Sequence, residues 1–172
     1  MIPPPAAGTY RIIYADKLRA LAADPNAALE LGKAAEHLVC ADLILQGYRA
    51  YLTDQGLPYD VVVDCAGRLI RIQVKATCRA KNVNSQGRAP REAYCFSARR
   101  RGKRGAKNLT DGDCDVVAFC ALDIRVVAYL PVKDVAQTVY LMSPGYIFRG
   151  RFKRRRHETI DGYPFAEIVR GI

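Results

Sequence analysis

Two runs rich in β-branched residues, separated only by Ala66-Gly67, form the clearest pattern along the chain, between Pro58 and Thr77. Glycine reaches the positive φ that a tight turn requires, so the pattern predicts a β-hairpin with a two-residue loop. With this loop, Cys65 lies opposite Arg68, and directly opposed residues point to the same side of the sheet. The pattern therefore also predicts which side chains share a face.

The two faces of this hairpin differ in character. In the predicted register Asp60 lies opposite Gln73, and Lys75 points the same way because side chains alternate along a strand. A loop of three residues would shift the register by one and move Asp60 to the other face. A half-exposed hairpin with a solvated Asp–Lys pair also explains the alternation, and this alternative stays open here. The second face holds an apolar set suited to a core: Tyr59, Val61, Val63, Ile70, Ile72 and Val74.

A long helix is predicted to start at Asp24-Pro25, where Asp suits the N-cap and Pro the first helical position, and to end at about Gln46, before Gly47. Glu36 lies at the edge of an apolar face, where a glutamate is more often solvent-exposed than functional. Gly32, one turn earlier, would let that face approach another surface closely. The broad apolar side is expected to hold Leu31, Ala34, Ala35, Leu38, Ala41 and Leu45.

The remaining elements place one domain after an N-terminal extension. Residues 1–23 are expected to form that extension, with a short helix at 16–23, and residues 77–92 a polar loop. A helix followed by strands predicts an α/β fold with a mixed sheet over residues 24–172. Further strands are expected at 49–53, 93–98, 115–121, 126–132, 139–142 and 165–169, with 115–121 and 126–132 paired as a hairpin.

The charge of the chain points to a polyanionic partner. The formal net charge is +10, and 12 of the 27 Lys and Arg residues lie in two runs that no acidic residue interrupts. Such clusters favour nucleic acid with little regard to sequence. An anionic membrane surface is the rival, but neither run lies on an amphipathic helix. The basic residues expected to bind DNA are Arg99, Arg100, Arg101, Lys103, Arg104 and Lys107 in the first run, and Arg149, Arg151, Lys153, Arg154, Arg155 and Arg156 in the second.

Several classes of protein are disfavoured. No apolar run reaches the roughly 18 residues of a membrane span, and the N-terminus lacks the features of a signal peptide, so a cytoplasmic protein is expected. The 6 cysteines contain no Cys-x-x-Cys pair and the chain has only 2 histidines, which disfavours structural zinc and predicts reduced cysteines. Phosphate-binding glycine loops and Ser/His/Asp patterns are also missing from the sequence.

Taken together, Glu36 on the first long helix, Asp60 within Pro58-x-Asp on one strand, and Gln73-x-Lys75 on the next resemble the PD-(D/E)XK nuclease superfamily. In that superfamily the helix often supplies a Glu, one strand the Asp and the next strand a (D/E)-x-K motif. Here Gln replaces the usual acidic residue, which resembles the branch that includes homing endonucleases encoded in group I introns. The resemblance implies a restriction-endonuclease-like core with a central mixed β-sheet flanked by helices.

The resemblance also implies a Mg²⁺-dependent endonuclease that acts on double-stranded DNA. Asp60, the amide oxygen of Gln73 and the main-chain carbonyl of Val74 would bind Mg²⁺, for which Mn²⁺ could substitute, and Glu36 would act directly or through water. Lys75 would orient or deprotonate the attacking water, or stabilise charge on the phosphate. Because Gln carries no negative charge, weaker metal binding is expected and the number of metal ions stays open.

Three kinds of function remain open from the sequence. A nuclease could be homing-type, restriction-like or a Holliday-junction-type resolvase. The same fold could instead serve as a non-catalytic nucleic-acid-binding module, and a basic structural or RNA-associated protein is a third reading. Symmetric DNA sites are usually cut by dimers, so a homo-oligomer, dimer or tetramer, is expected.

Overall fold

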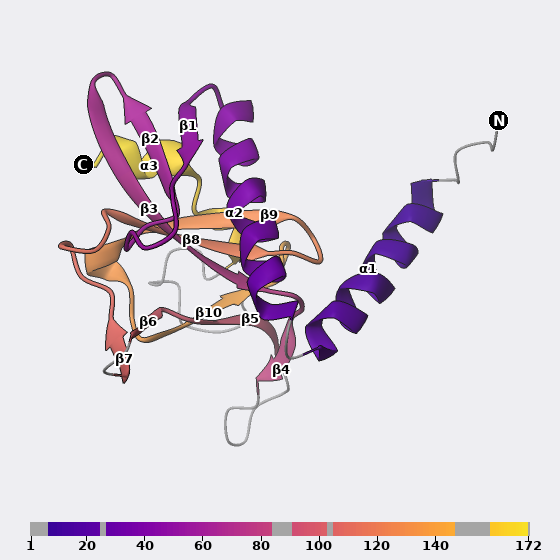
Figure 1. Cartoon of the computed structure of the whole chain (residues 1–172). Coiled ribbons are helices and arrows are strands. Elements are labelled where there is room, and N and C mark those ends of the chain that lie inside the picture. Colours follow the sequence, from indigo (N-terminus) through magenta and orange to yellow (C-terminus); the bar gives the residue numbers. More distant parts are fainter. Residues whose placement is uncertain (1–6, 25–26, 84–90, 103–104, 147–158, 172) are drawn as a thin grey trace, which may run out of the picture.

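A computed structural model describes residues 7–24, 27–83, 91–102, 105–146 and 159–171. The fold is mixed α/β with a central five-stranded sheet and flanking helices, as the sequence predicts (Figure 1). The elements in chain order are α1 (Ala7–Ala23), α2 (Ala28–Leu45), β1 (Arg49–Leu52), β2 (Val61–Cys65), β3 (Arg68–Thr77), β4 (Lys81–Val83), β5 (Arg91–Ser97), β6 (Arg99–Gly102), β7 (Gly105–Asn108), β8 (Val116–Ala121), β9 (Val126–Pro131), η2 (Val132–Asp134), β10 (Thr138–Met142), η3 (Ile160–Gly162) and α3 (Phe165–Val169).

The central sheet has the strand order β1-β2-β3-β8-β9. Strands β3 and β8 run parallel, whereas the other neighbouring pairs are antiparallel, which makes the sheet mixed. A second, antiparallel sheet has the order β10-β5-β4, and β6 pairs with β7 alone. The parallel pairing joins strands that are distant in sequence, so it brings the segment before β8 next to the middle of β3.

The β2–β3 hairpin has the predicted two-residue turn. Ala66 and Gly67 both have positive φ, 54° and 88°, as a type I′ turn requires, and this turn matches the twist of the two strands. Cys65 pairs with Arg68 and Val63 with Ile70. The three-residue alternative is therefore wrong.

Helix α2 ends as predicted but starts later. Gly47, with φ of 89°, donates its N–H to the carbonyl of Ile44 at 2.9 Å, and Tyr48 donates to that of Leu43 at 3.0 Å. This paired closure is a Schellman motif, in which glycine adopts the left-handed conformation without a steric penalty. The helix begins at Ala28 with Ala27 in the N-cap position, so the expected N-cap at Asp24 is wrong. Pro25 lies outside the described residues.

The buried stripe of α2 is narrower than the sequence suggests. Ala35, Val39 and Leu43 are fully buried, whereas Ala34, Ala41 and Leu45 are exposed. The sheet covers this stripe of small and branched residues, and Leu45 remains 87% exposed just before the helix turns into β1. Residue type alone favoured the wider, leucine-rich side, because it does not fix how the helix is rotated over the sheet.

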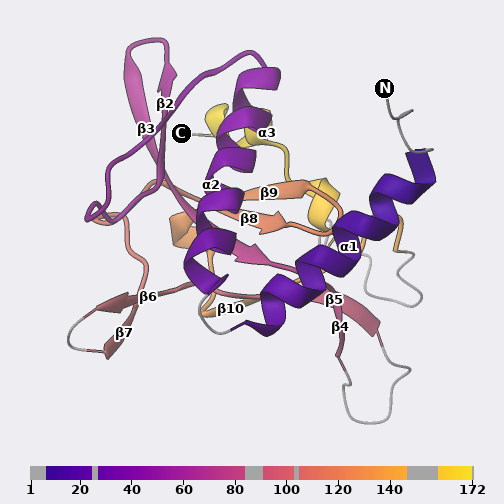
Figure 2. The same cartoon turned by 45° about the vertical axis from the view of Figure 1, so that its right-hand side comes forward.

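Two hydrophobic clusters lie on opposite sides of the central sheet. Helix α2, which crosses in front of β8 and β9 in Figure 2, covers the side of the first cluster. The first packs α2 against the hairpin through Val61, Val63, Ile70 and Ile72, and it includes Phe165 of α3, which lies against Tyr48 and Tyr129. The second, on the side of β5 and β10, surrounds Phe96 and Phe119, whose ring centroids are 5.1 Å apart. Tyr59 packs against the second cluster, not the first as expected, because it precedes β2 and the alternation of the strand does not extend to it.

Three other expectations are corrected by the structure. The N-terminal helix starts at Ala7, and it stands away from the rest of the fold except near Tyr14, which donates to the Leu122 carbonyl at 2.8 Å, and the buried Leu18 (Figure 1). Residues 77–92 include strand β4, and the first basic run forms the β6–β7 pair. Residues 165–169 form a helix because Phe165, Ile168 and Val169 follow helical spacing and pack inward together.

All 6 cysteines are free in the structure. Within the described ranges, no helix is both long enough and apolar enough to cross a membrane.

Candidate active site

Asp60 and Gln73 are cross-strand neighbours, as the hairpin register predicts. The Asp60 N–H donates to the Ile72 carbonyl at 2.8 Å, just before the ladder of β2 and β3 begins with Val61 opposite the same Ile72. The Asp60 carboxylate accepts hydrogen bonds from the side-chain amide of Gln73 and, at 2.7 Å, from the Val74 N–H. The carboxylate is thus fixed at the point where β2 begins and directly over the middle of β3.

This polar face is turned into the protein. Gln73 is only 8% exposed, and the neighbouring parallel strand places the fully buried Val117 beside it and Phe119 beside Lys75. A solvated outer face is therefore the wrong description of this hairpin. Polar groups in such surroundings need partners or a ligand, because burial without them costs free energy.

Burial sets the electrostatics of Asp60 and Lys75. Burial raises the pKa of Asp60, although the hydrogen bond from Val74, the charge of Lys75 and the Gln73 amide oppose the shift. Burial lowers the pKa of Lys75, and the charge of Asp60 opposes that shift. Burial therefore disfavours the charged form of both side chains, and shifts of this kind are typical of functional sites.

Glu36 approaches the same site from α2. Its pKa is raised, first by burial and then by the negative charge of Asp60, so the two carboxylates interact. Glu36 is half-buried beside the Val39 stripe. A Cβ added at Gly32 would meet no described atom within 4 Å, so the expected close packing at Gly32 is absent and space remains one turn before Glu36.

The donor set suits a metal ion that keeps most of its water ligands. Among the described residues, no three His, Cys, Asp or Glu side chains gather to hold a metal. Asp60 and Glu36 supply two interacting carboxylates, and the Gln73 amide adjoins both Asp60 and, at 3.4 Å, the Val74 carbonyl. A half-turn of that amide exchanges its nitrogen and oxygen, so the oxygen could join Asp60 in binding a cation. Mg²⁺ binds with one or two carboxylates and several waters, so these residues fit it.

The basic residues predicted to bind DNA are only partly within the described structure. Arg99, Arg100 and Lys107 are exposed on β6 and β7, and Arg101 occupies the register position opposite Ala106. Lys103 and Arg104 lie outside the described residues, as does the whole second run: Arg149, Arg151, Lys153, Arg154, Arg155 and Arg156.

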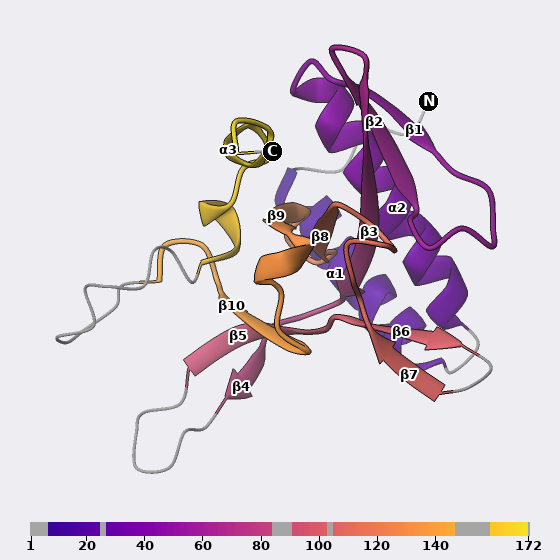
Figure 3. The ribbon, with the colours of Figure 1, turned by 90° about the vertical axis from the view of Figure 1, so that its left-hand side faces the viewer.

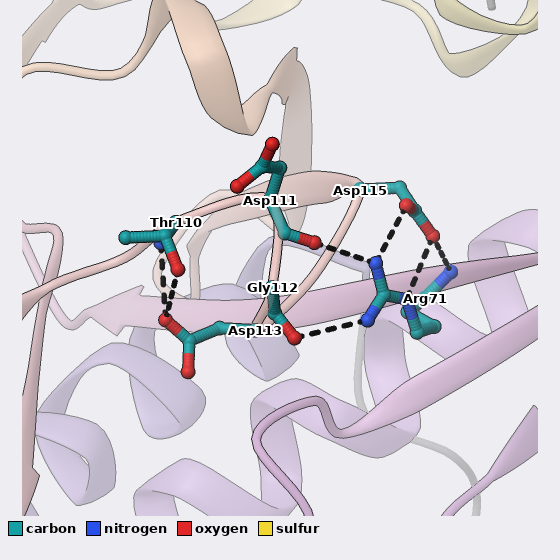
Figure 4. Close-up of polar contacts among 6 residues, drawn as sticks. All are labelled: Arg71, Thr110, Asp111, Gly112, Asp113 and Asp115. Atoms are coloured by element: carbon teal, nitrogen blue, oxygen red, sulfur yellow. Dashed lines mark hydrogen bonds and ion pairs between the residues drawn. The ribbon is translucent and has the colours of Figure 1, made fainter.

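An Arg71–Asp115 clamp beside the site was not predicted from the sequence (Figure 4). The Arg71 guanidinium donates to both Asp115 carboxylate oxygens, at 3.1 and 2.9 Å, and to the carbonyls of Asp111 and Gly112, at 2.7 and 3.1 Å. The Arg71 N–H also donates to Asp115 at 2.8 Å. These bonds hold the segment before β8 against β3, two residues from Gln73. Arg71 lies on the same face of β3 as Gln73 and Lys75, because side chains alternate along a strand. This alternation was the sequence feature from which a role for Arg71 near the site could have been predicted.

The clamped segment also reaches toward the basic residues. Asp113 accepts from the N–H and hydroxyl of Thr110, at 3.1 and 2.9 Å, and forms an ion pair with Arg100 at 3.1 Å. The positive charge of Arg100 also contributes to lowering the pKa of Lys75. Burial raises the pKa of the Cys114 thiol, and the main chain of Gln73 opposes this shift. One short segment therefore contacts both the site strand and β6.

Comparisons with known proteins agree with this fold. A family model described as "PD-(D/E)XK endonuclease" matches residues 28–144, which is more than half of the chain. Among solved structures, the bacterial homing endonuclease I-Ssp6803I is similar, with a TM-score of 0.58 and 19% sequence identity, and the match covers 84% of this chain and 95% of that one. At this identity the likeness establishes the fold. A search of curated proteins found no match.

Proposed function

Because the chain belongs to the PD-(D/E)XK endonuclease family, we propose that it is a Mg²⁺-dependent endonuclease that hydrolyses phosphodiester bonds in duplex DNA. The observation that carries this proposal is the half-buried face on which Asp60, Gln73 and Lys75 meet, with Glu36 beside it. The structurally similar protein is a homing endonuclease, which supports DNA as the substrate. The exposed Arg and Lys of β6 and β7 supply the positive charge that duplex DNA attracts.

Each site residue has a role that its position allows. Asp60, Glu36, the amide oxygen of Gln73 and the Val74 carbonyl would hold the ion. When bound, Mg²⁺ polarises the phosphate and lowers the pKa of a bound water. Lys75 lies on the same face with a lowered pKa, so its neutral amine is more available to accept the proton that an attacking water must lose. In its charged form, the same ammonium would stabilise the negative charge that develops on the phosphate.

The direct test of this proposal is a cleavage assay with and without Mg²⁺. Supercoiled plasmid, linear duplex DNA and a synthetic four-way junction should be incubated with the protein in Mg²⁺ or EDTA. Mg²⁺-dependent cleavage of duplex DNA supports the endonuclease, whereas cleavage confined to the junction supports a resolvase. Binding with no cleavage of any substrate, in Mg²⁺ or Mn²⁺, contradicts the proposed activity and leaves a nucleic-acid-binding module.

Mg²⁺ should stabilise the wild-type protein against heat, and Asp60→Asn should abolish this effect. The pKa of Asp60 is raised in the folded state, so its ionised form costs stability at neutral pH, and that cost appears as the pH rises through the folded pKa. A bound cation relieves this cost. At a Mg²⁺ concentration 100 times the dissociation constant, binding adds about 2.7 kcal/mol to the free energy of unfolding. Thermal unfolding in EDTA and in increasing Mg²⁺ measures the shift.

The matched control for this measurement is Asp54→Asn, because Asp54 is an exposed carboxylate in the same connection between β1 and β2. It should keep the full Mg²⁺-dependent shift. In EDTA, Asp60→Asn should unfold at a temperature no lower than wild type, since asparagine keeps an acceptor for the Val74 N–H without the buried charge. An equal Mg²⁺ shift in Asp60→Asn and wild type would place the metal elsewhere.

The second basic run should contribute to binding without regard to sequence. Replacing Arg154, Arg155 and Arg156 with alanine should weaken binding to all duplexes alike, because each arginine bound to a phosphate releases condensed counterions. Removing one such interaction should reduce the magnitude of the log–log salt slope by about 0.9 on duplex DNA. Fluorescence anisotropy over a range of salt concentrations measures both slopes. Equal slopes mean that these arginines do not contact phosphate, and a loss confined to one sequence means that they read bases.

A further inference from the structure

The β6–β7 pair, which we call the ribbon, stands apart from both larger sheets. Figure 1 and Figure 3 show it projecting from the same end of the molecule as β4. All four residues of β7 are exposed, as are Arg99 and Arg100 on β6. A two-stranded ribbon is at most marginally stable in water by itself. Its projection from the fold is therefore not explained by a gain in stability. A ribbon of this kind fits the major groove of B-form DNA.

The two faces of the ribbon have different surroundings. Arg99 pairs with Asn108, and Arg100 with Lys107, so each pair shares one face. Arg100 is tied to Asp113 by an ion pair at 3.1 Å, which turns its face toward the clamped segment before β8. Arg99 and Asn108 share the opposite face of the ribbon.

The face with Asn108 continues into a hollow at the foot of the ribbon. The hollow has a volume of about 330 Å³ and is lined by the described residues Asn108, Thr110, Lys133 and Gln137, among others. Their side chains offer both hydrogen-bond donors and acceptors. Apolar residues (Ala98, Leu109, Val132, Val135 and Ala136) and the acidic Asp111 also line the hollow, so Asn108, Lys133 and Gln137 are the side chains that could bind the edge of a nucleic acid.

The chemistry of each face matches a different part of DNA. Arginine forms paired hydrogen bonds with O6 and N7 of guanine, and asparagine does so with N6 and N7 of adenine. Arg99 donates one N–H to the Ala106 carbonyl at 3.3 Å, which directs the guanidinium along the ribbon. Arg100 and Lys107 on the other face are suited to phosphates, for which charge matters more than shape.

We propose that the ribbon enters the major groove and reads purines with Arg99 and Asn108, while Arg100 and Lys107 contact the phosphates. The inference rests on the proposed function in that its ligand is duplex DNA. Asp113 belongs to the segment that Arg71 clamps to the site strand, so the ribbon and Lys75 are held in a fixed relation. The bases that the ribbon reads should therefore lie at a constant distance from the cut.

Selection from a randomised duplex library tests the ribbon. One arm isolates bound duplexes in EDTA, and the other sequences the ends produced in Mg²⁺. Arg99→Lys keeps the charge but loses the forked donor, so preference for guanine at one position should fall by about 10-fold or more, with the salt slope unchanged. Asn108→Ala should lose preference for adenine at a neighbouring position.

Lys107→Ala is the matched control on the opposite face of the ribbon. It should weaken binding to all sequences alike and reduce the salt slope by about 0.9. Because these side chains are exposed, circular dichroism should give the wild-type spectrum for each variant. If Arg99→Lys and Asn108→Ala keep the wild-type base preferences, or if wild type has none, the ribbon does not read bases. Binding selection that succeeds without Mg²⁺-dependent cleavage leaves the ribbon inference intact and contradicts the proposed activity instead.

Discussion

Lys75→Ala should lower the Mg²⁺-dependent cleavage rate by about 10²- to 10⁴-fold, the range expected when a positioned proton-transfer group is removed. Lys75 shares the half-buried face of Asp60 and Gln73, and its pKa is lowered by burial. DNA affinity should change little, because the exposed basic residues lie on other elements. Single-turnover cleavage and anisotropy in EDTA measure the two effects separately.

Lys75→Arg separates the two chemical roles of this residue. Arginine keeps the positive charge but does not deprotonate in proteins, so it can stabilise charge on the phosphate and cannot act as a base. If Lys75 acts as a base, the wild-type rate should rise with pH until it passes a pKa below 10.5, and Lys75→Arg should be as slow as Lys75→Ala. Substantial activity in Lys75→Arg would assign electrostatic stabilisation instead.

Asp60→Asn should cause a comparable loss of cleavage, because it removes the carboxylate at the centre of the donor set. The controls are Lys17→Ala and Asp54→Asn, which replace exposed residues of the same types outside the site. Both should cleave at the wild-type rate. Normal cleavage by Asp60→Asn would place the catalytic site elsewhere in the protein.

Arg71→Met should destabilise the protein by about 2 kcal/mol, which lowers the melting temperature by roughly 4–8 °C for a chain of this size. Arg71 makes two charge-assisted bonds to Asp115 and two bonds to main-chain carbonyls. The side chains are 31% and 25% exposed, so the loss should be smaller than for a fully buried ion pair. Urea unfolding measures the change.

A double-mutant cycle with Asp115→Asn isolates the contribution of the pair, because contacting residues do not behave additively. Arg79→Met, at an exposed position after β3, is the control and should change stability by less than about 0.5 kcal/mol. Additive effects of Arg71→Met and Asp115→Asn would mean that the two side chains do not stabilise the fold as a pair.

The clamp should also depend on pH. Burial alone would raise the pKa of Asp115, but the hydrogen bonds and charge of Arg71 outweigh it and the pKa lies below its ordinary value. The stability that results is present when the pH is above the pKa of Asp115 in the unfolded chain. It is lost as the pH falls through the lower pKa that Asp115 has in the folded protein. Wild type should therefore lose more stability than Arg71→Met when the pH is lowered below about 4.

The clamp links stability to the site, because it holds β8 in register beside Gln73 and Lys75. Arg71→Met should also slow cleavage under conditions in which the protein is fully folded. A loss of stability with an unchanged cleavage rate would limit the clamp to a structural role.

The sequence by itself determined the local geometry of this protein. Alternation over β2 and β3 and the glycine at 67 specify a type I′ turn, which sets the register and hence the meeting of Asp60 and Gln73. Gly47 likewise specifies the end of α2. These features depend on neighbours a few residues apart, and the periodicity of strand and helix records such contacts directly.

Only the tertiary structure decided the surroundings of that geometry. The parallel pairing of β3 with β8 buries the polar face and creates the clamp between Arg71 and Asp115, which are 44 residues apart. The tertiary structure also decides which stripe of α2 is covered, and it places Phe165 against Tyr48 and Tyr129. Contacts between distant segments depend on the summed packing of the whole chain, so no local pattern of apolar and polar residues encodes them.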